Sequence, residues 1–170
     1  HSKARGAKIY AEVFGTLSYN EADHAMRMDI TGKKAASGIK KLIQISKRNL
    51  DDVDYFCGHG TATYTNDLAE GRSMKLIYEG VPKEKWAPLG SIKPIYGHTF
   101  GAAGILNVAA TALMIDEQTL CPTINLKNVD PECEQDHISE GYRKAKIDFA
   151  ISLAFAIGSQ SSFISLGVPD

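Results

Sequence analysis

Two histidines and one lysine lie among small residues in the middle of the chain. His59 stands between Gly58 and Gly60, and His98 follows five residues after Lys93. Imidazole exchanges protons near neutral pH, and a lysine side chain supplies a compact positive charge. Such groups in a small-residue setting indicate a catalytic site that works together with a nucleophile.

Two carboxylates follow His59. Asp67 and Glu70 are three residues apart in the first turn of a helix that we predict for residues 66–78, so they share one face of that helix. Acidic residues are common in the first turn because they interact favourably with the helix dipole. The alternative is a functional role, in which they orient the two histidines.

A metal site is a second chemical interpretation of these residues. His59, His98, Asp67 and Glu70 offer nitrogen and oxygen ligands. The sequence contains no HxxH or HxxxH pair, and Lys93 near His98 would oppose a bound cation. We therefore predict that the chain binds no metal ion.

Three cysteines are present, and none is predicted to be the nucleophile. Cys57, Cys121 and Cys133 are odd in number and lack CxxC spacing, so neither a disulfide framework nor a zinc site is indicated. Cys57 lies two residues before His59 but ends an apolar run, which favours a buried core thiol. Cys121 precedes a proline and Cys133 falls in a polar loop, and neither has a local activating group.

Composition is that of an ordinary globular domain. The 170 residues carry 19 basic and 20 acidic side chains, and 44% of them are hydrophobic. This balance argues against nucleic acid or an anionic membrane surface as a partner. No long uncharged apolar run is present, and residues 1–6 lack the pattern of a signal peptide. These features predict a soluble, cytoplasmic protein.

Alternating strands and helices predict an α/β fold with a mixed β-sheet packed with helices. The expected strands are residues 8–14, 54–57, 89–93, 147–157 and 162–166. The expected helices are residues 34–49, 66–78 and 102–116, with a long loop over residues 17–33. The last two strands, joined by residues 158–161, are predicted to form an antiparallel pair. The helix at 102–116 is apolar on every side, which is typical of a central helix in a larger core.

Five segments, taken in order, resemble the C-terminal half of the β-ketoacyl-acyl carrier protein synthases, the elongating condensing enzymes of thiolase-like fold. The segments are residues 4–13, 53–55, 59–63 with Asp67 and Glu70, 91–104 and 122–126. The resemblance runs nearly end to end, so residues 1–170 are expected to be a ketoacyl synthase C-terminal domain, one half of a thiolase-like fold.

The resemblance implies a decarboxylating Claisen condensation in fatty acid or polyketide synthesis. An acyl group on a cysteine would be attacked by the carbanion that forms when malonyl-carrier protein loses carbon dioxide. His59 and His98 match the two family histidines and would donate N–H groups to the enolate oxygen. Lys93 matches the family lysine and is expected to pair with Glu70, while Asp67 is expected to orient its neighbours.

Substrates and partners follow from the same resemblance. Thr61 and Thr63 match the threonines that bind the phosphopantetheine arm of acyl carrier protein, so no resident cofactor is expected. The family's catalytic cysteine belongs to an N-terminal half that has no counterpart in this sequence. The chain alone is therefore expected to be inactive, with acyl carrier protein and that N-terminal half as partners and a homodimer of the complete enzyme.

One segment departs from the family pattern. The family reads Phe-Gly-Phe-Gly-Gly-Thr-Asn near its C-terminus, where this chain has residues 155–161. Ile157 stands in place of the gating phenylalanine, with Gly158 after it, at the position implied to bind substrate. Ser159 in place of glycine is expected to alter the turn.

A non-catalytic interpretation stays open. Aromatic polyketide systems contain a chain-length-factor subunit that pairs with the active ketosynthase and has usually lost its catalytic residues. His59, Lys93 and His98 are all intact here, which favours the enzyme.

Overall fold

Five strands form one mixed sheet in the computed structural model, which describes residues 1–26 and 28–169. The spatial order is β1-β7-β6-β2-β3. The strands span β1 Glu12–Asn20, β2 Tyr55–Cys57, β3 Leu89–Gly90, β6 Phe149–Ala156 and β7 Gln160–Gly167. β7 is antiparallel to both of its neighbours, whereas β6, β2 and β3 are mutually parallel. The predicted α/β class with a mixed sheet is confirmed.

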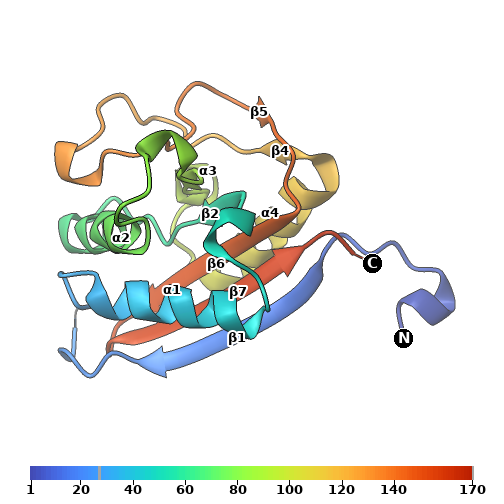
Figure 1. Ribbon diagram of the computed structural model, residues 1–170, viewed down its shortest axis with the longest axis horizontal. Helices are drawn as coiled ribbons and strands as arrows, with labels where there is room; N and C mark the ends of the chain where they lie inside the picture. The colour runs from blue at the N-terminus through green and yellow to red at the C-terminus, as the bar shows by residue number, and fades with distance from the viewer. Residues whose placement is uncertain (27, 170) are drawn as a thin grey trace.

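Helices cover both faces of the sheet (Figure 1). α1 Lys33–Ile45 and α2 Tyr64–Ile77 pack together on one face, and α4 Ala103–Glu117 packs against β6 and β7 on the other. A hydrophobic core lies on each face of the sheet, and alternate residues of β2 point into one or the other. Phe56 packs with side chains of α1 and α2, whereas Tyr55 and Cys57 pack with side chains of α4.

Short elements complete the chain. They are η1 Lys3–Arg5, η2 Leu50–Asp52, η3 Lys83–Lys85, α3 Lys93–Tyr96, η4 Phe100–Ala102, β4 Thr119–Leu120, η5 Pro131–Cys133 and β5 Arg143–Lys144. β4 and β5 form a separate antiparallel pair. Residues 121–142 are otherwise irregular and run past the free edge of β3.

The first strand is displaced from its predicted position. It begins at Glu12 instead of residue 8 and continues to Asn20, so the prediction of a loop over residues 17–33 was wrong for residues 17–20. Leu17 and Tyr19 alternate there with the polar Ser18 and Asn20. The ladder with β7 extends to Asn20 opposite Gln160, and the Ser18 and Ser162 hydroxyls hydrogen-bond at 2.8 Å. Pairing with β7 therefore fixes where this strand ends.

The third strand is shorter than predicted. The sequence indicated a strand over residues 89–93, but β3 ends at Gly90 and Lys93 begins the short helix α3. Proline at position 94 fits the first turn of a helix and cannot donate to a sheet ladder, which accounts for the early end of β3.

The central apolar helix is only partly covered. α4 buries Ala110, Met114 and Ile115 against the sheet, but Ile105 and Leu113 are 65% and 50% exposed. Residues Phe100–Glu117 are long and apolar enough to cross a membrane by length and composition, a test that the core helix of a globular protein also passes. The packing of α4 on β6 and β7 favours the core-helix interpretation.

Candidate active site

His59 and His98 are brought together at the carboxyl edge of two parallel strands. His59 follows β2 by two residues, and His98 follows α3, which comes directly after β3. Parallel neighbours end at the same edge of a sheet, so the segments that follow them converge. The two imidazole rings meet edge to face, with centroids 5.4 Å apart and planes at 87°. The predicted grouping of the two histidines is therefore observed.

Glu70 organises the turn that carries His59. The residue is 2% exposed, and its carboxylate accepts the His59 backbone N–H at 2.7 Å and the Gly60 backbone N–H at 2.6 Å. The Asn66 amide adds a third donor at 2.7 Å. Burial raises the pKa of Glu70, and these three hydrogen bonds oppose that rise. Glu70 thus fixes the backbone of the turn that carries His59.

The predicted pairing of Lys93 with Glu70 was wrong. Within the described residues no ion pair joins them. The Lys93 ammonium instead donates to the backbone carbonyl of His59 and lies 3.4 Å from its Nδ1. The Glu70 carboxylate accepts hydrogen bonds from backbone N–H groups instead, and the pattern of side chains in the sequence does not indicate such partners. Burial lowers the pKa of Lys93, and the charge of Glu70 opposes this from a distance.

Each histidine has its Nδ1 atom occupied. The Nδ1 of His98 accepts the backbone N–H of Phe100 at 3.1 Å, and the Nδ1 of His59 faces the Lys93 ammonium. A neutral ring that accepts at Nδ1 carries its proton on Nε2. Neither Nε2 atom has a hydrogen-bond partner among residues 1–26 and 28–169. Each ring therefore presents one N–H donor.

Burial and charge keep both rings neutral. Burial, followed by the charges of Lys93 and His98, lowers the pKa of His59 to about 3. Burial and Lys93 also lower the pKa of His98. Neutral imidazoles donate from Nε2 without carrying a charge of their own.

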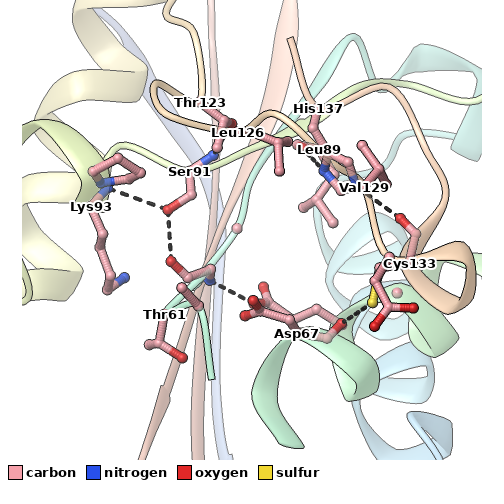
Figure 2. A pocket seen from close by; sticks show the side chains of 18 of the residues that line it. Thr61, Asp67, Leu89, Ser91, Lys93, Thr123, Leu126, Val129, Cys133 and His137 are labelled. Carbon is pink, nitrogen blue, oxygen red and sulfur yellow. Dashed lines mark hydrogen bonds between the residues drawn. The ribbon is translucent and has the colours of Figure 1, made fainter. Parts of the chain in front are cut away.

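A cavity of about 650 Å³ is lined by His98 and by Gly58 and Gly60, the two neighbours of His59 in sequence. Figure 2 shows Thr61 and Asp67 along its lower edge and Thr123 and Leu126 along its upper edge. The hydroxyls of Thr61 and Thr63 hydrogen-bond to each other at 2.7 Å at its mouth. Asp67 accepts from the Asn66 amide at 3.0 Å, which places it beside Glu70 on the same helix face, as predicted.

Gly60 and Ser91 fix the floor of this cavity. Gly60 has φ +45°, and a Cβ there would lie 2.5 Å from the Ser91 Cβ atom. The Ser91 hydroxyl donates to the Gly60 carbonyl at 2.8 Å, and the Ser91 backbone N–H donates to the Thr123 hydroxyl at 3.0 Å. Only glycine combines this conformation with so close an approach.

Ile157 and Gly158 lie apart from the cavity. Ile157 is 67% exposed in the turn between β6 and β7, and neither residue is part of the cavity wall. The Gly158 N–H donates to the Ala25 carbonyl, and the Ser159 hydroxyl both accepts from and donates to the backbone of His24. Ser159 has φ +56°, so it keeps a turn geometry that favours glycine. The turn is thus tied to the loop at residues 21–26.

No cysteine of the chain is placed as a nucleophile. Cys57 is fully buried, as predicted, and burial raises the pKa of its thiol to about 11. Burial also raises the pKa of Cys121 and Cys133. No group of three metal-binding side chains is found in the described ranges 1–26 and 28–169.

Three residues were not predicted to belong to the site. Asn107 of α4 is buried and donates to the carbonyls of Gly58 and Leu153, which ties the helix to the end of β2. Cys133 and His137 line the cavity from the irregular segment that passes β3. Each of them has a contact that spans 46 or more residues in sequence, so no local pattern could place them in the site.

Comparison with known proteins identifies the family. Residues 10–127 match the family described as "Beta-ketoacyl synthase, C-terminal domain". The 3-oxoacyl-[acyl-carrier-protein] synthase 2 of Mycobacterium tuberculosis is 33% identical over 98% of this chain and 39% of its own length. The tetracenomycin polyketide synthase ketoacyl synthase alpha subunit of Streptomyces glaucescens is 32% identical over 99% of this chain and 39% of its own length. The chain thus spans about two fifths of these relatives.

Solved structures agree with this assignment. The structure of a type II polyketide synthase acyl-carrier protein in complex with its ketosynthase, AntDE:AntF, superposes with a TM-score of 0.92 at 31% identity, covering 100% of this chain and 41% of that one. The ishigamide ketosynthase/chain length factor superposes with a TM-score of 0.92 at 27% identity, covering 99% of this chain and 40% of that one.

Proposed function

The chain belongs to the β-ketoacyl synthase C-terminal domain family and has its thiolase-like fold, and on that basis we propose that residues 1–170 form the C-terminal half of a β-ketoacyl-acyl carrier protein synthase. The activity is a decarboxylative condensation of an acyl thioester with malonyl-carrier protein, in fatty acid or polyketide synthesis. The observation that carries the proposal is the pair of neutral, touching imidazoles whose Nδ1 atoms are both occupied.

The histidines serve the first chemical step. The bond between the malonyl carboxylate and its α-carbon breaks, carbon dioxide leaves, and the electron pair becomes an enolate. His59 and His98 donate from Nε2 to the enolate oxygen, as an oxyanion hole does, each worth about 3 kcal/mol by analogy with other enzymes. Their lowered pKa values suit this role, because a neutral ring donates one hydrogen bond and surrenders no proton.

The second step requires a nucleophile from elsewhere. The enolate carbon attacks the acyl carbonyl, a carbon–carbon bond forms, and the carbon–sulfur bond to a cysteine breaks with the thiolate leaving. The three cysteines of this chain have raised pKa values, and Cys57 is inaccessible. We therefore assign the nucleophile to an N-terminal half, and we expect the isolated chain to be inactive.

The remaining site residues position these groups. Lys93 holds His59 through its carbonyl and Nδ1, and Glu70 holds the same turn through two backbone N–H groups. Asp67 supports Asn66, which supports Glu70. The site as proposed contains no metal and no resident cofactor.

Substrate reaches the site on the phosphopantetheine arm of acyl carrier protein. The hydroxyls of Thr61 and Thr63 at the cavity mouth would hydrogen-bond the polar arm. Ile157 and Gly158 would contact the acyl chain from the turn between β6 and β7, although they lie outside this cavity. The related ketosynthase solved in complex with its acyl-carrier protein supports this class of partner.

The N-terminal half would cover the exposed side of α4, where Ile105 and Leu113 face outward.

We further propose a homodimer of the complete enzyme, located in the cytoplasm. A chain-length-factor-like subunit is the second candidate, supported by the likeness to a ketosynthase/chain length factor structure. The intact set of His59, Lys93 and His98 favours the enzyme.

The two half-reactions separate these proposals experimentally. In the complete enzyme, His59→Ala and His98→Ala should abolish malonyl decarboxylation and leave acyl transfer to the cysteine largely intact. Lys93→Ala should lower condensation through lost positioning of His59, whereas the matched variant Lys85→Ala on the exposed η3 should not. Equal loss of both half-reactions in the histidine variants would contradict the assigned role, and no condensation in the wild type would favour the chain-length-factor alternative.

A further inference from the structure

The two histidines of the candidate site are held in different ways. His59 is 7% exposed, its Nδ1 lies 3.4 Å from the Lys93 ammonium, and its ring meets the Phe155 ring edge to face at 5.9 Å. His98 is exposed and lies between α3 and η4. Apart from the contact with His59, the hydrogen bond and the ring contact of the His98 imidazole within the described ranges both come from Phe100. The orientation of His98 therefore depends on residue 100.

Phe100 contacts the His98 ring twice. Its backbone N–H donates to Nδ1 at 3.1 Å, and its aromatic ring stacks on the imidazole, with centroids 5.0 Å apart and planes at 23°. Stacked aromatic rings attract each other, so this contact opposes rotation of the imidazole out of its plane. The hydrogen bond thus holds one edge of the His98 ring, and the stack holds its face.

The backbone of Phe100 has a conformation that bulky residues rarely adopt. Its φ is +49°, in the left-handed region that favours glycine. Ile138 has φ +56°, but its side chain is 0% exposed, so burial within the chain offsets the strain there. Phe100 is 80% exposed and gains little from burial. Backbone strain at an exposed residue beside a candidate catalytic histidine indicates a functional constraint.

We propose that Phe100 is a positioning residue whose ring holds the His98 imidazole in the plane from which Nε2 donates. The Phe100 N–H is bound to His98, so rotation about the N–Cα bond of Phe100 decides where its side chain lies. At φ +49° the ring lies on the imidazole. Phe100 thus does for the exposed histidine what Lys93 and Phe155 do for the buried one. This inference rests on the proposed function, because it concerns the same enolate step.

Phe100→Gly removes the ring and keeps the backbone N–H. In the complete enzyme, kcat for malonyl decarboxylation should fall about fivefold, the effect of losing one aromatic contact. KM for malonyl-carrier protein should change less than about twofold, because the ring contacts the histidine. The urea midpoint should not fall, since glycine relieves the left-handed strain. Phe100→Tyr keeps the ring and should recover most of the rate.

Carbon-13 relaxation of the imidazole Cδ2–H groups measures the order of each ring and does not depend on activity. In the protein that carries this sequence, both rings should be ordered, and in Phe100→Gly the His98 ring alone should become mobile. Phe100→Leu, which keeps an apolar side chain without a ring, should behave like Phe100→Gly. Tyr142→Leu is the matched control, because Tyr142 is 75% exposed and is not part of the cavity wall. It should change neither the rate nor the order of His98.

Three results would overturn the role of Phe100. The first is a His98 ring that stays ordered in Phe100→Gly, and the second is an unchanged decarboxylation rate beside a mobile ring. The third is a urea midpoint that falls together with the rate, since Phe100 would then serve the stability of the fold. A wild-type enzyme that does not decarboxylate malonyl-carrier protein would contradict the proposed function instead, and the order of the His98 ring would still decide whether Phe100 positions it.

Discussion

Replacing Glu70 by Gln should destabilise the protein by about 2–3 kcal/mol. The wild-type carboxylate accepts backbone N–H groups from His59 and Gly60 on different oxygens, and the Asn66 amide shares one of these oxygens. Gln has the same shape but turns one acceptor into an NH₂ donor. Whichever way the amide is oriented, at least one buried donor then faces another donor.

The magnitude follows from two opposing terms. Two facing donors left unsatisfied cost about 1–3 kcal/mol each. Part of this is recovered because the neutral amide avoids the burial cost that raises the pKa of Glu70. The net loss of about 2–3 kcal/mol corresponds to a urea midpoint lower by about 1 M, for a slope of about 2–3 kcal/mol per M.

Urea unfolding followed by circular dichroism measures this change. Glu79→Gln is the matched control, because Glu79 is exposed immediately after α2 and should change stability by less than about 0.5 kcal/mol. Equal midpoints for Glu70→Gln and Glu79→Gln would refute the reasoning, since the hydrogen bonds from the His59 and Gly60 backbone N–H groups to Glu70 would then not stabilise the fold.

Three further predictions concern stability and thiol access. The pKa of His59 is lowered to about 3 in the folded protein, against about 6.5 in the unfolded chain. Its contribution to stability is therefore present above pH 6.5, and about 4 kcal/mol of unfolding free energy is lost as the pH falls toward 3. A pH series of unfolding free energies should show this loss in the wild type and not in His59→Gln. Asn107→Leu should cost about 2 kcal/mol in urea unfolding, because the buried carbonyls of Gly58 and Leu153 lose their donor; an unchanged midpoint would argue against this tie. Native alkylation followed by mass spectrometry should modify Cys121 and Cys133 before Cys57, which is 0% exposed; early labelling of Cys57 would contradict the described core.

The elements with a strong hydrophobic period were predictable from sequence. Apolar positions such as Ile39 and Leu42 at helical spacing located α1, and the apolar run before Gly58 located β2. The strand limits were not predictable where pairing decides them. Asn20 is in a strand only because Gln160 lies opposite it.

The candidate site was predictable as a set of residues but not as a network. The motifs grouped His59, His98 and Lys93 correctly, because they follow two parallel neighbouring strands. The partners of Glu70 were not predictable, because they are backbone N–H groups that point toward its carboxylate only after the turn has formed. His137 was missed because its partner Leu89 is 48 residues away.

The central proposal is that His59 and His98 direct two Nε2–H donors at one developing oxygen. A high-resolution structure of the complete enzyme with a stable malonyl-thioester analogue tests it most directly. The proposal predicts the analogue's thioester oxygen within about 3 Å of both Nε2 atoms, with each Nδ1 still bound to its present partner. An oxygen held by only one of the two rings, or by a metal ion between them, would contradict it.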